Sequence, residues 1–118
     1  MISVKSQQGR TGEDLAVRYL QDQGLKMVTR NYRCRCGEVD LIMRDGPALV
    51  FVEVRLRRSS RYGTPAETVT ARKQTRLIRT AQFYLQTTRS QDPCRFDVVA
   101  IGGNSGDIQW IQDAFAAF

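Results

Sequence analysis

The sequence predicts an α/β or α+β domain around one mixed sheet, with the element order α-β-β-β-α-β-β. Three observations lead to this prediction. Two segments repeat apolar residues at helical spacing, five shorter runs are rich in β-branched or aromatic residues, and turn residues separate the segments. The chain of 118 residues has the length of one domain, so we expect residues 1–118 to fold as a single unit.

The first helix is expected from Thr11 to Gln23. Its apolar residues share one face, Thr11 is a suitable N-cap, and Gly24 follows the last turn. The preceding residues 1–8 are polar and are expected to form a flexible N-terminus. A first strand is predicted from Leu25 to Tyr32.

A β-hairpin is the strongest local pattern in the sequence. Its strands are predicted from Glu38 to Arg44 and from Ala48 to Leu56, with the turn residues Asp45-Gly46-Pro47 between them. The following segment from Arg57 to Glu67 contains glycine, serine and proline, and we expect an exposed, mobile, basic loop there.

The second half of the chain adds one helix and two strands. The helix is predicted from Thr70 to Thr87, with an apolar face and a basic polar side. Strands are predicted from Arg95 to Ile101 and from Asp107 to Ile111, with a turn over Gly102 to Gly106.

Composition excludes several kinds of site. The chain has no histidine, so it has neither a serine–histidine nor a cysteine–histidine catalytic pair, and no histidine-bound zinc. Its three cysteines, Cys34, Cys36 and Cys94, are expected to be reduced thiols, as is typical of a cytoplasmic protein. A metal site shared between chains through Cys34 and Cys36 is the alternative. The absence of a long apolar run or a secretory signal argues against a membrane partner.

The charge favours a nucleic-acid partner. Basic residues number 18 and acidic residues 12, which gives a net charge of +6, and 15 of the basic residues are arginine. Arginine binds phosphate through two parallel hydrogen bonds, so an arginine-rich basic domain suits nucleic acid. The ordinary alternative is that these charges keep the protein dissolved.

The hairpin places two carboxylates together. Because side chains alternate along a strand, the apolar residues of both strands share one face, and Asp40, Glu53 and Arg55 lie on the other. A two-residue loop at Gly46-Pro47 puts Asp40 directly opposite Glu53, whereas a loop at Asp45-Gly46 makes them diagonal neighbours. Either register leaves their Cβ atoms about 5–8 Å apart.

Two neighbouring carboxylates repel each other unless a cation or a proton lies between them. Arg55 could be that cation, which would make the group a structural cluster. The functional interpretation is a Mg²⁺ or Mn²⁺ site, because such ions bind one or two carboxylates with a backbone carbonyl, here that of Val54, and several waters.

Five motifs resemble, in their order, those of the YraN-like family of bacterial proteins, over about residues 9–115. They are Gly12-Glu13, Arg30-Asn31, Gly37-Glu38-Val39-Asp40-Leu41-Ile42, Val50-Phe51-Val52-Glu53-Val54-Arg55 and Arg95-Phe96-Asp97-Val98-Val99. The family is similar to restriction-endonuclease-like PD-(D/E)xK nucleases, and among them to archaeal Holliday junction resolvases. The resemblance implies a three-layer fold with a mixed central sheet.

The resemblance also implies roles for single residues. Asp40 and Glu53 match the two acidic metal ligands, and Glu13 matches a helical glutamate that completes the metal site. The ordinary alternative for Glu13 is a first-turn residue favoured by the helix dipole. For Asp97 we expect a structural role or a role in supporting the site residues, such as accepting hydrogen bonds from backbone amides.

One residue departs from the motif: Arg55 stands where the family pattern has lysine. Arginine keeps its proton in proteins, so Arg55 cannot act as a general base, although it can stabilise negative charge at a phosphate. Lys73, at the start of the second predicted helix, is a possible substitute for the missing lysine.

Three hypotheses about function remain open. The first is a metal-dependent DNA endonuclease, selective for DNA structure, with Mg²⁺ or Mn²⁺ and with catalytic residues Glu13, Asp40, Glu53 and Arg55. The second is a nucleic-acid-binding protein of nuclease fold with weak or no catalysis, and the third is a protein-interaction domain. A homodimer would suit a two-fold symmetric DNA junction. The residues expected to bind the nucleic-acid backbone are Arg57, Arg58, Arg61, Arg72, Lys73 and Arg76.

Overall fold

The computed structural model describes residues 4–57, 69–102 and 107–116. Its elements follow the predicted order of two helices and five strands. They are α1 (Val4–Asp22), β1 (Lys26–Cys34), β2 (Gly37–Asp45), β3 (Ala48–Arg57), α2 (Ala71–Thr88), β4 (Cys94–Gly102) and β5 (Ile108–Ile111).

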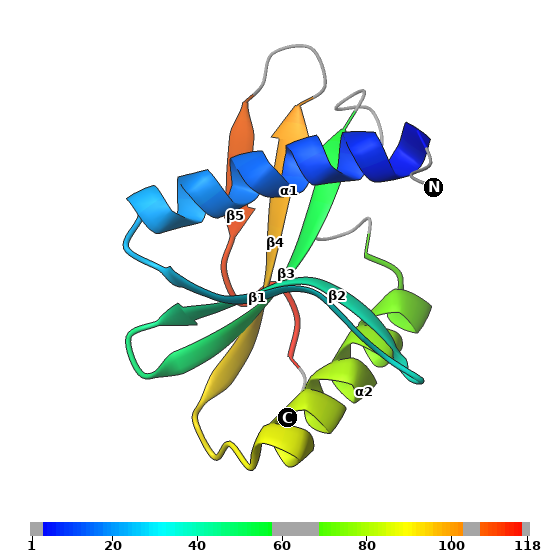
Figure 1. Ribbon diagram of the computed structural model, residues 1–118, viewed down its shortest axis with the longest axis vertical. Coiled ribbons are helices and arrows are strands. Elements are labelled where there is room, and N and C mark those ends of the chain that lie inside the picture. Colours follow the sequence, from blue (N-terminus) through cyan, green and yellow to red (C-terminus); the bar gives the residue numbers. More distant parts are fainter. Residues whose placement is uncertain (1–3, 58–68, 103–106, 117–118) are drawn as a thin grey trace.

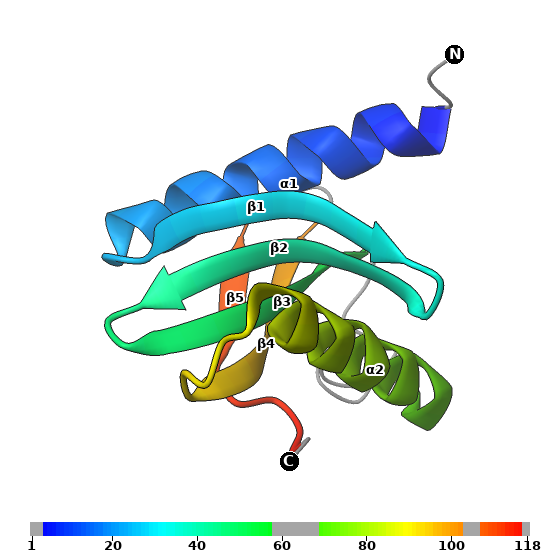
Figure 2. The ribbon, with the colours of Figure 1, turned by 60° about the horizontal axis from the view of Figure 1, so that its bottom comes forward.

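The five strands form one mixed sheet in the order β1-β2-β3-β4-β5. Strands β3 and β4 are parallel, and the other neighbouring pairs are antiparallel. A parallel pair needs a long crossover connection, and here α2 lies within it. Figure 2 shows α1 and α2 on opposite sides of the sheet, so the fold has three layers. The predicted fold class is confirmed.

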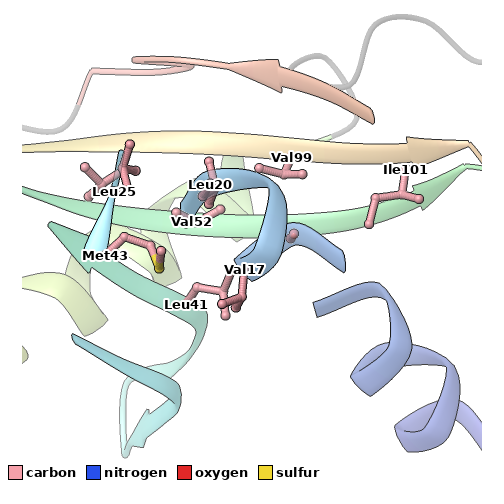
Figure 3. Packing of buried hydrophobic residues seen from close by; sticks show 10 residues of the cluster. Val17, Leu20, Leu25, Leu41, Met43, Val52, Val99 and Ile101 are labelled. Atoms are coloured by element: carbon pink, nitrogen blue, oxygen red, sulfur yellow. The ribbon is translucent and has the colours of Figure 1, made fainter. Parts of the chain in front are cut away.

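Each helix packs on its own face of the sheet through an apolar cluster. The α1 cluster joins Ala16, Val17 and Leu20 of the helix to strand residues such as Leu41 and Val52. Figure 3 shows Val17 and Leu20 beside Leu41 and Val52. The α2 cluster joins Leu77 and Ala81 of the helix to strand residues that include Ile42, Phe51 and Phe96. The sheet is therefore covered on both sides, as expected where it contains a parallel pair.

Helix α2 agrees with its predicted bounds to within one residue. The hydroxyl of Thr70 caps its start by accepting a hydrogen bond from the backbone N–H of Lys73 at 3.1 Å. Arg89 ends it in the left-handed conformation, with φ of 55°. These capping contacts fix the direction in which the first turn of α2 leaves the preceding chain.

Helix α1 differs from its predicted start. It begins at Val4, so Thr11 lies inside the helix and is not its N-cap, and residues 4–8, which we expected to be flexible, are helical. Lysine, glutamine and arginine are good helix formers, and they extend the helix although they show no apolar periodicity.

The basic loop predicted from Arg57 to Glu67 lies almost entirely outside the described residues. Cys34, Cys36 and Cys94 form no disulfide with one another.

The sheet splits between β2 and β3. Strand β2 stays paired with β1 as far as Gly37, but its pairing with β3 ends at Leu41 and Val52. Strand β3 continues beside β4 to Arg57. Figure 1 shows the β1–β2 pair turning away from β3 and β4.

This divergence corrects one predicted face assignment. We expected Val39 on the same face as Leu41, two residues away, because side chains alternate along a strand. Val39 instead packs in the α2 cluster, whereas Leu41 belongs to the α1 cluster. Strand β2 turns relative to the sheet once it has left β3, and Asp40 lies at this turning point.

Asp97 has the structural role that we predicted. It is 1% exposed, and its carboxylate accepts hydrogen bonds from the backbone N–H of Asp113, from Trp110 Nε1 and from Arg95 Nε, at 2.9, 2.9 and 3.0 Å. These bonds tie the segment that follows β5 to the centre of β4.

Replacing Asp97 with asparagine should destabilise the fold by about 2 kcal/mol, because the bonds from the partly buried Arg95 lose their charged acceptor and Arg95 keeps only the ion pair with Asp45. Urea unfolding followed by the fluorescence of Trp110 measures this change. The control is Asp92→Asn, which removes only the exposed ion pair with Arg44 and should change stability by less than about 1 kcal/mol. An Asp97→Asn protein as stable as the unmodified chain would contradict the structural role.

Candidate metal and nucleic-acid site

The hairpin register decides how Asp40 and Glu53 meet. Asp45 pairs with Ala48 across the turn, so the loop is Gly46-Pro47, and the ladder runs on to Leu41 and Val52. One further step along the same register brings Asp40 opposite Glu53. The first of the two predicted registers is therefore the observed one.

Asp40 sits where β2 and β3 separate. Its Oδ2 atom accepts a hydrogen bond of 2.8 Å from the backbone N–H of Val54. In a continuous hairpin a backbone carbonyl of the partner strand would accept this bond, but the strands have parted at this point. The carboxylate of Asp40 thus takes the place of the missing strand partner of Val54 N–H, and this hydrogen bond holds the carboxylate beside Glu53.

Glu53 is the more deeply buried member of the pair, with 5% of its surface exposed. Its Oε2 atom forms no hydrogen bond with any residue that the structure describes. Lys73 Nζ lies 3.2 Å from this oxygen as an ion pair, without the angles of a hydrogen bond. Glu53 therefore keeps one buried oxygen lone pair available to another ligand.

The pair has strong electrostatic consequences for Asp40. Burial raises the pKa of Asp40, and the side-chain hydrogen bond and negative charge of Glu53 act in the same direction, giving a pKa of about 8. The Val54 N–H and the Lys73 ammonium act in the opposite direction but do not compensate. Two carboxylates in this position need another cation or a proton, which is typical of functional sites.

Glu13 approaches Asp40 and Glu53 from α1. It lies on the helix face that points toward the sheet, as predicted. The helix comes close to β3 here, since a Cβ atom on Gly12 would lie 3.1 Å from Leu56. Burial and the negative charge of Asp40 raise the pKa of Glu13. Its Oε1 atom is buried without a hydrogen bond to any described residue, and Arg30 Nη2 lies 3.6 Å away.

The structure thus brings Asp40 and Glu53 together and leaves Glu13 within electrostatic reach. Within residues 4–57, 69–102 and 107–116, no three acidic or cysteine side chains are close enough to form a metal cage by themselves. Two carboxylates still fit Mg²⁺ or Mn²⁺, because Mg²⁺ commonly binds one or two carboxylates and keeps several waters. The buried Oε2 atom of Glu53, which accepts no hydrogen bond from a described residue, is also suited to bind such an ion.

A cavity of about 520 Å³ opens above Asp40, between the end of the β1–β2 hairpin and the first turns of α2. Three cationic side chains line it, namely Arg33, Lys73 and Arg76, against the acidic Glu38 and Asp40. Arg33 is ion-paired with the exposed Glu38, so Lys73 and Arg76 are the cations that line the cavity with Asp40. A carboxylate beside two cations suits a phosphodiester together with a divalent cation.

The predicted nucleic-acid-binding residues fall into two groups. Lys73 and Arg76 line the cavity, and Arg72 is exposed beside them on α2. The side chain of Arg57 and the whole of Arg58 and Arg61 lie outside the described residues. The sequence analysis missed Arg33, because only the folded hairpin shows that the end of β1 faces α2.

No helix in the described part of the chain is long and apolar enough to cross a membrane.

Comparison with known proteins agrees with the motifs. A family model described as "Uncharacterised protein family UPF0102" matches residues 12–101. The chain belongs to the UPF0102 family. The predicted resemblance to the YraN-like family is thereby confirmed.

Relatives within the UPF0102 family align over nearly their whole length. A UPF0102 protein of Nitrosomonas europaea is 50% identical over 115 residues, which cover 97% of this chain and 98% of the relative. One from Stutzerimonas stutzeri is 48% identical, with the same coverage of both chains. One from Nitrosococcus oceani is 51% identical and covers 91% of this chain and 90% of its own.

Replacing Asp40 with asparagine should stabilise the protein near pH 7. The amide oxygen keeps the bond from Val54 N–H, and the variant no longer needs to take up a proton at position 40 on folding. Since the pKa of Asp40 rises from 3.8 to about 8 on folding, the unmodified chain loses stability as the pH rises between these values, and the variant does not. Thermal unfolding should show a Tm increase on the order of 5 °C at pH 7.

The difference between the two proteins should shrink as the pH approaches 4, where Asp40 is protonated in both the folded and the unfolded chain. If Asp40→Asn is less stable than the unmodified chain at pH 7, the carboxylate pair is a structural cluster.

Proposed function

We propose that this protein is a metal-dependent DNA endonuclease, selective for branched DNA. The observation that carries the proposal is the pair of Asp40, which lines a cavity with basic residues, and Glu53, which is buried beside it. Buried carboxylates whose negative charge is not compensated lower the stability of the fold. Their position beside cations that can bind phosphate is best explained by a catalytic function.

The metal ion would be Mg²⁺ or Mn²⁺, held by Asp40 and Glu53, with Glu13 acting from the α1 side. When bound, such an ion lowers the pKa of a coordinated water and polarises the scissile phosphate. The Val54 N–H keeps the Asp40 carboxylate in place for this task. In the overall reaction a water oxygen bonds to phosphorus, the phosphorus–oxygen bond to the leaving strand breaks, and that oxygen takes up a proton.

The basic residues have a separate role in holding DNA. Arg33 and Arg76 on the cavity wall, and Arg72 beside it, would contact backbone phosphates. Such contacts give affinity without reading the base sequence. Arg55, two residues after Glu53 on β3, would stabilise negative charge near the phosphate, because its guanidinium stays protonated.

The preference for branched DNA follows the resemblance to archaeal Holliday junction resolvases. A homodimer belongs to the same proposal, because two cuts across a two-fold symmetric junction need two sites.

A second function is a nucleic-acid-binding protein of nuclease fold that does not cleave. The position of Arg55 favours it, since arginine cannot act as a base. This alternative predicts DNA affinity that falls steeply with salt and does not respond to EDTA. Turnover by the unmodified chain would exclude it.

The test is incubation of the protein with labelled four-way junctions, flaps and linear duplexes, with Mg²⁺, with Mn²⁺ or with EDTA. We expect cleavage of branched DNA that needs the metal and falls by at least about 100-fold in Glu53→Gln and Asp40→Asn. Asp92→Asn, which alters only an exposed ion pair distant from the cavity, is the matched control and should cleave normally.

Two outcomes would contradict the proposal. Cleavage that persists in Glu53→Gln would place the active site elsewhere. DNA binding without cleavage of any substrate, in either metal, would leave the non-cleaving alternative.

A further inference from the structure

We propose that Lys73 is a catalytic residue of this site, whose ammonium group donates a hydrogen bond to the scissile phosphate and stabilises its negative charge. The inference rests on the proposed nuclease function. Of the two roles expected for Lys73, a contact with the nucleic-acid backbone and a substitute for the missing lysine, it selects the second and assigns the group on which Lys73 acts.

The first argument is position. Lys73 Nζ lies 3.2 Å from Glu53 Oε2. Lys73 also lines the cavity, whereas Arg55 is not among the cavity-lining residues of the described chain. A phosphate that meets a metal on Asp40 and Glu53 therefore meets the Lys73 ammonium at the same time.

The second argument is a local conflict at the start of α2. The N-terminal end of a helix carries partial positive charge and favours acidic side chains. The first turn of α2 has no acidic residue, and it carries the cations Arg72 and Lys73 instead. The helix would be more stable with an acidic residue at position 73, so a departure from this preference beside a cavity indicates a function.

The third argument compares two ion pairs of the same molecule. In the structural pair, Arg95 contacts Asp97 through several hydrogen bonds, and their side chains are 20% and 0% exposed. In the other pair, Lys73 is 42% exposed and makes a single contact with Glu53 that lacks hydrogen-bond angles. Its ammonium group thus keeps room for hydrogen bonds to a ligand.

The backbone supports this position without restricting the ammonium group. Thr70 caps the N–H of Lys73, and Gln74 Nε2 donates a hydrogen bond of 2.9 Å to the carbonyl of Val69, which is buried. The Cα atom of Lys73 is therefore fixed, while its four-carbon side chain can shift Nζ from Glu53 to a phosphate.

The experiment measures single-turnover cleavage of a four-way junction at saturating protein, so that affinity does not enter. Lys73→Met should reduce the rate by about 100- to 1,000-fold, the usual cost of losing one charge-stabilising donor. Arg72→Met should weaken binding of the junction but keep most of the saturated rate. Arg18→Met removes an exposed cation of α1 and should change neither quantity.

Calorimetry of Mn²⁺ binding without DNA gives a second readout. Lys73→Met should bind Mn²⁺ at least as tightly as the unmodified chain, because the ion no longer shares Glu53 with an ammonium group. Glu53→Gln should lose this binding. If Lys73 only supported the fold, Lys73→Met would lower the Tm and weaken the Mn²⁺ affinity together, and the inference would be wrong.

The remaining outcomes separate this inference from the proposed function. Normal cleavage by Lys73→Met, with cleavage lost in Glu53→Gln, would overturn the role of Lys73 and leave the nuclease proposal standing. No cleavage by the unmodified chain would overturn both. A double variant, Lys73→Met with Arg55→Lys, returns an ammonium group near Glu53, and recovery of part of the lost rate would support the inference.

Discussion

The separation of β2 from β3 after Leu41 and Val52 is the constraint on which the candidate site depends. It leaves the backbone N–H of Val54 without a strand partner, and the carboxylate of Asp40 accepts its hydrogen bond instead. The cavity lies beside this separation, between the hairpin end and α2. A continuous ladder would have paired these backbone groups and left Asp40 as an ordinary strand residue.

Asp97 and the Asp40–Glu53 pair, both in the described part of the chain, differ in how far their buried negative charge is compensated. Asp97 has a charged partner and two further hydrogen-bond donors, so its burial holds β4 and the chain end together. Asp40 and Glu53 have one backbone donor and one half-exposed lysine between them. Burial of uncompensated charge costs free energy. A pair such as Asp40 and Glu53 is therefore expected where a bound ligand compensates the remaining negative charge. In the proposed function, a phosphate with a divalent cation is that ligand.

Much of this arrangement could be predicted from local patterns. The strand alternation around Asp40 and Glu53 placed both carboxylates together, and the turn residues limited the register to two choices. The sequence could not decide between these choices, because both loops have suitable turn residues. The sequence also could not predict the ion pair between Lys73 and Glu53 or the packing of Val39 against α2. Both depend on how α2 packs against the part of β2 that has left β3. The early start of α1 at Val4 was missed because its first turns carry no apolar pattern.

The most direct test of the central claim is a crystal structure of the protein grown with Mn²⁺, with anomalous scattering measured at the manganese absorption edge. The account predicts one anomalous peak between Asp40 and Glu53, about 2.0–2.3 Å from an oxygen of each carboxylate. Such a peak would show that these side chains bind a hard cation. A map without a peak there, with Lys73 still paired to Glu53, would contradict the account.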